Sequence, residues 1–232
     1  MSDAPAAGDH EPPRDLLAAH PETAYFWGRV AGDGDLTAER VRVRAAEESV
    51  ARRLAAIAGD DGRVAGERTV ERPYAHDASL ARVEGEYTVK VFGGAADRAA
   101  AAFGLPIDGT DGGYRLDALA EHDRQLLRGL LEAAGTVCFR ESEGVVGVSF
   151  VHDDRALLEW VRNALAENGF GSNDLAETSS GGYWFGVADA DTAAFGEWVY
   201  EGSDATGLYA DDRRTKLLRS IERAAQVSEG AD

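Results

Sequence analysis

An aspartate enclosed by glycines is the first pattern in this chain that suggests chemistry. The segment FWGRVAGDG, residues 26–34, reads as the end of a helix, with Asp33 between Gly32 and Gly34. A carboxylate at the C-terminal end of a helix faces the negative pole of the helix dipole, so we expect a cation beside it. A divalent ion held between two such carboxylates and a scissile phosphate is a common arrangement for metal-assisted phosphodiester hydrolysis.

A second segment, roughly a hundred residues later, repeats this frame but lacks the acid. In LRGLLEAAG, residues 127–135, Ala134 stands where the first segment has Asp33. Glu132 lies two positions earlier, which turns its side chain by about 200° around a helix, so we expect it to point away from a shared site. Small residues recur at a spacing of four in both segments and predict a close helix–helix interface. They are Gly28 and Gly32 in the first segment, and Gly129 and Ala133 in the second.

The elements around these segments follow the same order in each half of the chain. In the first half, the patterns predict helices over 22–34, 47–59 and 95–104, and strands over 40–44 and 86–92. Residues 108–113, DGTDGG, form a turn-rich joint. In the second half, the patterns predict a helix over 119–134, a hairpin over 136–152, a helix over 154–171, a strand over 181–188 and helices over 191–202 and 211–226. Two similar halves predict an internal pseudo-twofold axis.

The charge of the chain is strongly acidic and poor in lysine. The 232 residues carry a formal net charge of −18, and only Lys90 and Lys216 are lysines among 24 basic residues. A dense carboxylate surface of this kind is typical of halophilic proteins, in which salt screens the self-repulsion. The alternative is an acidic protein that seeks a basic partner. The net charge therefore does not exclude nucleic acid as a partner, and only local charge can decide.

Several sequence features indicate the cellular compartment that we expect for this protein. No apolar run approaches the roughly 20 residues that a membrane-spanning helix needs, and the first 15 residues lack the pattern of a secretory signal. The single cysteine, Cys138, excludes an intrachain disulfide and fits a reducing compartment. We expect a cytoplasmic protein without membrane contact, with a disordered acidic tail over residues 1–20.

The two glycine-bearing segments carry a family resemblance. FWGRVAGDG resembles the LAGLIDADG motif of homing endonucleases, and LRGLLEAAG resembles its second, here degenerate, copy in single-chain members. The closing segment WVYEGSDATGLYADDRRTK is similar to the family's aromatic segment and Arg-Lys-type pair. The resemblance implies an α+β fold of two pseudo-symmetric αββαββα-type repeats, 21–117 and 118–225, followed by a tail over 226–232. Antiparallel saddle sheets would pack under helices, with the motif helices at the repeat interface of a monomer.

The same resemblance assigns roles to residues. The family's metal-binding acid precedes the final motif glycine, which makes Asp33 the catalytic and metal-binding candidate and leaves Ala134 without this function. Because the family binds double-stranded DNA through its strands, basic strand and closing-helix residues become DNA-binding candidates: Arg40, Arg42, Arg44, Lys90, Arg140, Arg214 and Lys216. Glu141 and Glu143 make the second half the poorer DNA surface, and Trp184 is a candidate for an exposed contact.

Three functions remain open from the sequence. The first is a homing-endonuclease-like DNA-binding protein that does not cut both strands, because Ala134 replaces the second metal-binding acid. The second is an active or nicking endonuclease that uses Mg²⁺ as its cofactor. The third is a scaffold reused for binding a protein or a small ligand.

Overall fold

The computed structural model describes residues 15–74 and 77–229. Its first half contains α1 (Pro21–Asp33), β1 (Gly34–Thr37), β2 (Arg40–Ala45), α2 (Glu48–Ile57), η1 (Gly59–Asp61), β3 (Gly62–Tyr74), β4 (Asp77–Phe92) and α3 (Ala95–Phe103). Its second half contains η2 (Leu116–His122), α4 (Asp123–Ala134), β5 (Gly135–Arg140), β6 (Val145–His152), α5 (Arg155–Glu167), β7 (Ala176–Glu177), β8 (Tyr183–Gly186), α6 (Thr192–Tyr200), α7 (Ser203–Thr206) and α8 (Asp211–Glu229).

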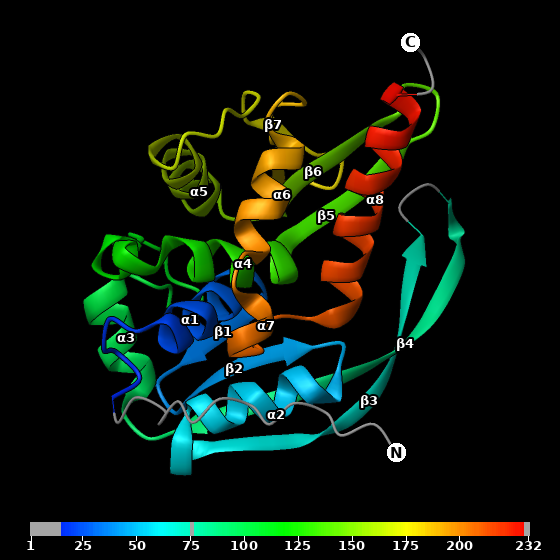
Figure 1. Cartoon of the computed structure of the whole chain (residues 1–232). Coiled ribbons are helices and arrows are strands. Elements are labelled where there is room, and N and C mark those ends of the chain that lie inside the picture. Colours follow the sequence, from blue (N-terminus) through cyan, green and yellow to red (C-terminus); the bar gives the residue numbers. More distant parts are fainter. Residues whose placement is uncertain (1–14, 75–76, 230–232) are drawn as a thin grey trace.

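The strands form two antiparallel four-stranded sheets with the same topology. The first sheet has the order β1-β2-β4-β3, and the second has the order β5-β6-β8-β7. In both halves, the first strand of the sheet begins directly after the motif helix, at Gly34 and at Gly135. Figure 1 shows α1 and α4 next to each other in the middle of the molecule, with the first sheet below them and the second above. The α+β fold of two αββαββα units predicted from the sequence is confirmed.

The alternation along β2 explains which face of the first sheet meets the helices. Val41, Val43 and Ala45 are buried, whereas the intervening Arg40, Arg42 and Arg44 are half-buried. Because successive side chains of a strand point to opposite faces, the arginines lie on the face away from the helical core. The core itself contains aromatic contacts in each half: Trp27 with Phe26 and Phe103, and Phe150 with Phe185 and Phe195.

The β3–β4 hairpin and the N-terminal segment differ from the sequence predictions. The strand predicted over 86–92 is the end of the much longer β4, which pairs with β3 in a hairpin that extends beyond the body of the molecule (Figure 1). The polarity of residues 62–74 hid β3, because this ribbon has no continuous apolar face to reveal its period. The predicted acidic tail lies outside the described residues up to 14, but Leu16 is buried and its carbonyl accepts a hydrogen bond from Trp27 Nε1.

The other terminus is also more structured than predicted. α8 continues to Glu229, so residues 226–229 of the predicted tail are helical, and 230–232 lie outside the described residues. Among residues 15–74 and 77–229, none of the helices combines the length and the apolar character of a membrane-spanning segment.

Candidate active site and nucleic-acid interface

The two motif helices approach each other at backbone contact distance. A Cβ atom on Gly28 would overlap the carbonyl oxygen of Leu126, and one on Gly129 would overlap that of Tyr25. Further along, a Cβ on Gly32 would lie only 2.7 Å from the Cβ of Ala133. Glycine in a helix interior costs about 1 kcal/mol relative to alanine. The close packing of α1 against α4 offsets this cost, because the small residues let the two helix backbones approach closely.

This packing brings the ends of both helices together. A Cβ on Gly32 would lie 3.4 Å from the Cβ of Ala134, so the last turn of α1 touches the last turn of α4. Asp33 follows Gly32 directly and ends α1. The ends of the two motif helices, with Asp33 on one and Ala134 on the other, therefore lie next to each other.

A cation does stand beside Asp33, and it is an arginine. Arg44 of β2 donates a hydrogen bond from Nη1 to the Asp33 carboxylate at 2.8 Å, and its Nη1 lies 3.1 Å from the Asp33 carbonyl oxygen. The antiparallel pairing of β1 with β2 folds Arg44 back over the end of α1. The guanidinium thus neutralises both the side chain of Asp33 and the negative end of the helix.

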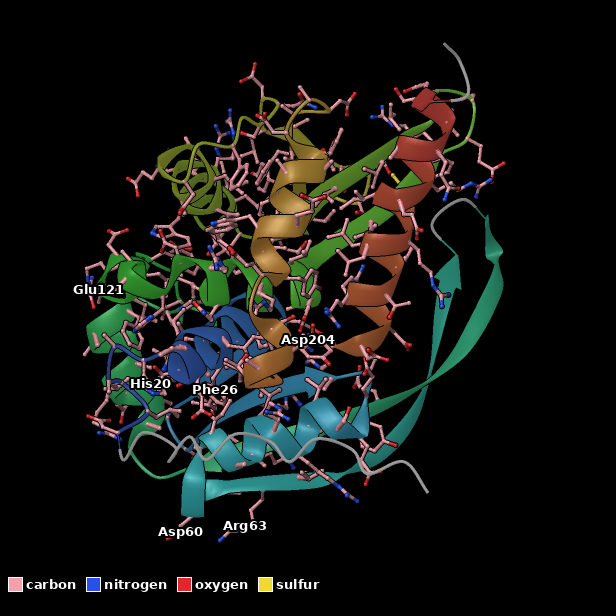
Figure 2. All side chains as sticks on the ribbon, viewed as in Figure 1. His20, Phe26, Asp60, Arg63, Glu121 and Asp204 are labelled. Carbon is pink, nitrogen blue, oxygen red and sulfur yellow. The ribbon has the colours of Figure 1, made fainter. Side chains whose placement is uncertain are left out.

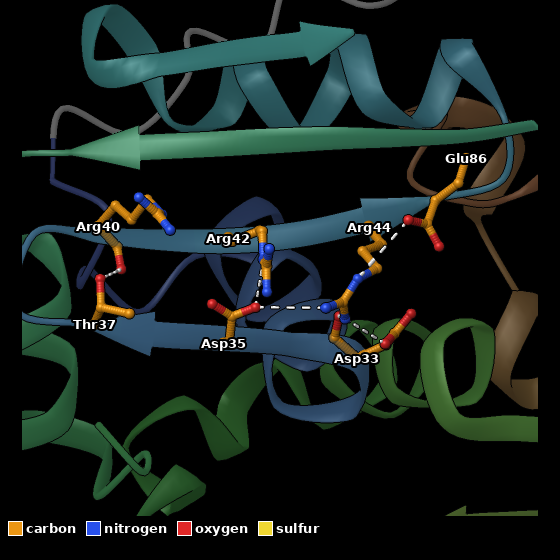
Figure 3. A network of polar contacts seen from close by, with 7 residues as sticks. All are labelled: Asp33, Asp35, Thr37, Arg40, Arg42, Arg44 and Glu86. Atoms are coloured by element: carbon orange, nitrogen blue, oxygen red, sulfur yellow. Dashed lines mark hydrogen bonds and ion pairs between the residues drawn. The ribbon is translucent and has the colours of Figure 1, made fainter. Parts of the chain in front are cut away.

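Arg44 is also the centre of a wider charge network, shown in Figure 3. Its guanidinium lies 3.6 Å from Asp35 and 3.9 Å from Glu86, and Asp35 accepts a hydrogen bond of 2.5 Å from Arg42. The Asp33 and Arg44 side chains remain about one third and one quarter exposed. Two of the arginines predicted to contact DNA are therefore already paired with carboxylates of the same sheet.

The strand register places further basic residues on this face. Arg42 pairs with Lys90 across β2 and β4, and Lys90 pairs with Arg63 across β4 and β3. Directly paired residues lie on the same face of a sheet, so these three side chains form a row across the strands. Figure 2 shows Arg63 projecting from the edge of the first sheet. Sequence reasoning missed Arg63 because its strand was not predicted.

The rest of the face adds the half-buried Arg40 and an exposed aromatic ring. Arg40 pairs in register with Phe92, whose side chain is 47% exposed. Among the described side chains of this face, the basic ones (Arg40, Arg42, Arg44, Arg63 and Lys90) outnumber the acidic ones (Asp33, Asp35 and Glu86). The face is locally basic although the chain is acidic.

The corresponding face of the second sheet has a different chemistry. Its outward positions on β5 are Thr136, Cys138 and Arg140, and Trp184 of β8 is 41% exposed. Arg140 is 2.5 Å from Asp189 and 3.2 Å from Glu143. The second face therefore offers small and apolar groups, together with an arginine whose charge is matched by two acids.

The sequence was compared with protein-family models and with known proteins. Residues 1–227 match the LAGLIDADG_4 family model, whose description is "Putative archaeal homing endonuclease". The chain belongs to the LAGLIDADG homing endonuclease family. No match was found among the curated proteins.

Solved structures agree on the fold of this LAGLIDADG protein. A structure of I-DmoI with DNA and Ca is 13% identical, with a TM-score of 0.53, over 87% of this chain and 98% of that chain. Mesophilic variants of the homing endonuclease I-DmoI are 15% identical, with a TM-score of 0.51, over 80% and 97%. Full-length DUF199/WhiA from Thermatoga maritima is 11% identical, with a TM-score of 0.50, over 95% and 68%.

The LAGLIDADG site of this chain does not fit a metal held by one acid from each motif. One of the two carboxylates is absent at Ala134, and Asp33 is bound to Arg44. Within the part of the chain that the structure describes, no group of three or more His, Cys, Asp or Glu residues is arranged to hold a metal ion. A metal bound in this place would first have to displace a guanidinium.

Glu132, the acid closest to Ala134 in the second motif, belongs to a buried cluster behind this site. Its carboxylate accepts hydrogen bonds from Tyr25 Oη at 2.6 Å and from the Ala210 amide at 2.9 Å, and Arg29 lies 3.7 Å away. Burial raises the pKa of the Glu132 carboxyl, and Arg29 opposes this rise. Burial also raises the pKa of Tyr25 well above its usual value. Glu132 ties α1 and α4 to the closing segment.

The two residues of the closing segment that were predicted to contact DNA, Arg214 and Lys216, have different surroundings. Arg214 lies 2.6 Å from Asp204, with its guanidinium over the ring of Tyr209. This packing gives Arg214 a structural role at the base of α8. Lys216 is exposed and lines a groove between α8 and β5.

Proposed function

We propose that this protein binds duplex DNA and does not cut both strands. The observation that carries the proposal is the unequal pair at the dyad, where Asp33 is neutralised by Arg44 and its counterpart is Ala134. Double-strand cleavage by a LAGLIDADG site requires an acid in each motif. DNA binding has support from the family and from the locally basic first sheet, and a structural neighbour, I-DmoI, was solved with DNA.

The two sheets would contribute unequally to recognition. The row of Arg42, Lys90 and Arg63 suits phosphate oxygens and guanine edges. The second sheet, with Arg140 matched by two acids, offers little attraction to phosphate. We therefore propose that one half of the target carries most of the sequence-specific contacts. Since both motif helices come from one chain, we also propose that the protein acts as a monomer.

The binding experiment starts from a random duplex pool, from which the protein selects its target at high KCl, the condition suited to the acidic surface. Affinity for the selected duplex is then measured by fluorescence anisotropy in EDTA and in Mg²⁺. We expect equal affinities in both, because Arg44 already supplies the cation at Asp33. Failure to select any duplex would contradict the proposal and favour a scaffold reused for a protein or small-ligand partner.

A second candidate function, nicking of one strand with Mg²⁺, is favoured by the remaining exposure of Asp33. The test is a supercoiled plasmid that carries the selected target, incubated with Mg²⁺ or Mn²⁺. We expect neither the nicked nor the linear form to accumulate. Nicking by the native protein that disappears in Asp33→Asn would establish this second function in place of the first, whereas nicking that persists in the variant indicates a contaminant.

A further inference from the structure

A groove of about 460 Å³ lies between α8 and β5. It is lined by Phe139 of β5 and by one face of α8: Asp212, Thr215, Lys216, Arg219, Ser220 and Arg223. We refer to these residues as the α8 groove. None of the roles assigned above accounts for them, apart from the prediction that Lys216 contacts DNA.

The basic residues of the α8 groove form a row. Lys216, Arg219 and Arg223 follow each other at spacings of three and four, which places them along one side of the helix. All three are exposed. Arg219 makes no ion pair with any residue in the described part of the chain, whereas Arg223 packs over the ring of Phe139 at 4.5 Å and lies 3.2 Å from Glu141.

The local charge of the groove contrasts with the rest of the molecule. Three basic side chains line the groove beside two carboxylates, Asp212 in the lining and Glu141 next to Arg223, in a chain with a net charge of −18. The three cations extend over about 10 Å of the helix, because each residue rises 1.5 Å. A row of this length matches a line of phosphates better than it matches one small anion.

The position of the groove relates it to the motif site. Phe139 lies on β5, which begins at Gly135 immediately after Ala134 and forms an edge of the second sheet. Figure 1 shows α8 extending along β5 from the centre of the molecule.

We infer that the α8 groove binds the phosphate backbone of duplex DNA. The inference rests on the proposed DNA-binding function and adds a contact outside the strands. It also explains how the second half holds DNA although its sheet offers a matched arginine and apolar groups. The backbone contact positions the duplex, and the first sheet reads its sequence.

The experiment measures the salt dependence of binding to the selected duplex for the native protein, Arg219→Ala, Arg219→Lys and the control Arg52→Ala. Arg52 is an exposed arginine of α2 that pairs with Glu48 within its own helix. We expect Arg219→Ala to weaken binding about tenfold for all sequences and to reduce the slope of log K against log salt by about one. Arg219→Lys should restore most of the affinity, and Arg52→Ala should change nothing. Thermal unfolding checks that each variant is folded.

Two results would overturn the inference in distinguishable ways. If Arg219→Ala keeps the native slope while Arg42→Ala reduces affinity, the α8 groove does not contact DNA, although the proposed function stands. If the native protein binds no duplex, both the proposed function and the role of the α8 groove are wrong. Loss of binding to single-stranded RNA but not to duplex DNA in Arg219→Ala would assign the groove to RNA and also overturn the inference.

Discussion

The guanidinium of Arg44 lies 2.8 Å from the carboxylate of Asp33, at the C-terminal end of the first motif helix. One side chain from the neighbouring strand thus provides the positive charge that a carboxylate at a helix end requires. The partner position, Ala134, provides no second acid to compete for a cation. Both features support the proposal that this chain does not hold a metal ion between one acid of each motif.

Removing Arg44 and restoring the second acid should create a metal site. In Arg44→Met combined with Ala134→Asp, two carboxylates at the dyad lack a protein cation, so we expect Mn²⁺ binding detectable by calorimetry and electron paramagnetic resonance. Ala134→Asp alone should bind Mn²⁺ at least tenfold more weakly, because Arg44 still occupies Asp33. Equal binding by the single and double variants would mean that Arg44 does not block the site.

The close approach of α1 and α4 should be intolerant of a single methyl group. In Gly28→Ala, the new Cβ would overlap the Leu126 carbonyl oxygen, a backbone atom that cannot rotate away. We expect a loss of about 3 kcal/mol in the free energy of unfolding, at the upper end of overpacking effects. Urea titration measures this loss. Gly94→Ala is the control, since a Cβ there meets nothing within 4 Å, and it should cost about 1 kcal/mol or less because Gly94 is the N-cap of α3 and alanine is a poor N-cap residue.

The sequence predicts the need for a cation at Asp33 but not its identity. The helix dipole and the flanking glycines are local features, so Asp33 could be found from them. Arg44 reaches Asp33 only because β1 and β2 pair with Gly34 opposite Val43, and this register depends on the folded sheet. The basic row across β2, β4 and β3 could be predicted only in part. Arg63 joins the row through its pairing with Lys90, and this pairing depends on the long β3–β4 hairpin, which the sequence patterns did not predict.

The role of Glu132 shows the same limit. Helical geometry alone predicts that its side chain points away from Asp33. Its partners, Tyr25 and the Ala210 amide, lie 107 and 78 residues away in the sequence. No local pattern connects such distant positions, so the buried cluster could only be found in the structure.

Glu132 should be essential to stability. In Glu132→Ala, the Tyr25 hydroxyl, the Ala210 amide and Arg29 lose a buried acceptor, and breaking a buried charge pair typically costs about 3–5 kcal/mol. We expect a loss of this size in denaturant unfolding. Glu132→Gln retains one acceptor oxygen and the volume, so it should lose less. If both variants are as stable as the native protein, the cluster contributes nothing.

The stability difference between the native protein and Glu132→Gln should depend on pH. Burial raises the pKa of the Glu132 carboxyl above its ordinary value of 4.5. The folded state then binds this proton more tightly than the unfolded chain, so the group lowers the free energy of unfolding as pH rises through the interval above 4.5. The native protein should therefore lose stability relative to Glu132→Gln from pH 4.5 toward neutrality. A difference that moves in favour of the native protein would mean that Arg29 outweighs burial.

The unequal sheets predict unequal effects of matched charge removals on DNA binding. Lys90 lies in the basic row of the first sheet, so Lys90→Ala should reduce affinity for the selected duplex several-fold and lower the salt slope by about one. Arg140 occupies the outward face of the second sheet but is matched by Asp189 and Glu143, so Arg140→Ala should leave affinity within about twofold of native. Anisotropy titrations over a series of KCl concentrations compare the two variants. Each variant removes one cation from a strand, so the change in net charge is the same in both and does not explain a difference in affinity. An equal loss in the two variants would show that both sheets contact phosphate alike, and the asymmetry proposed for recognition would be wrong.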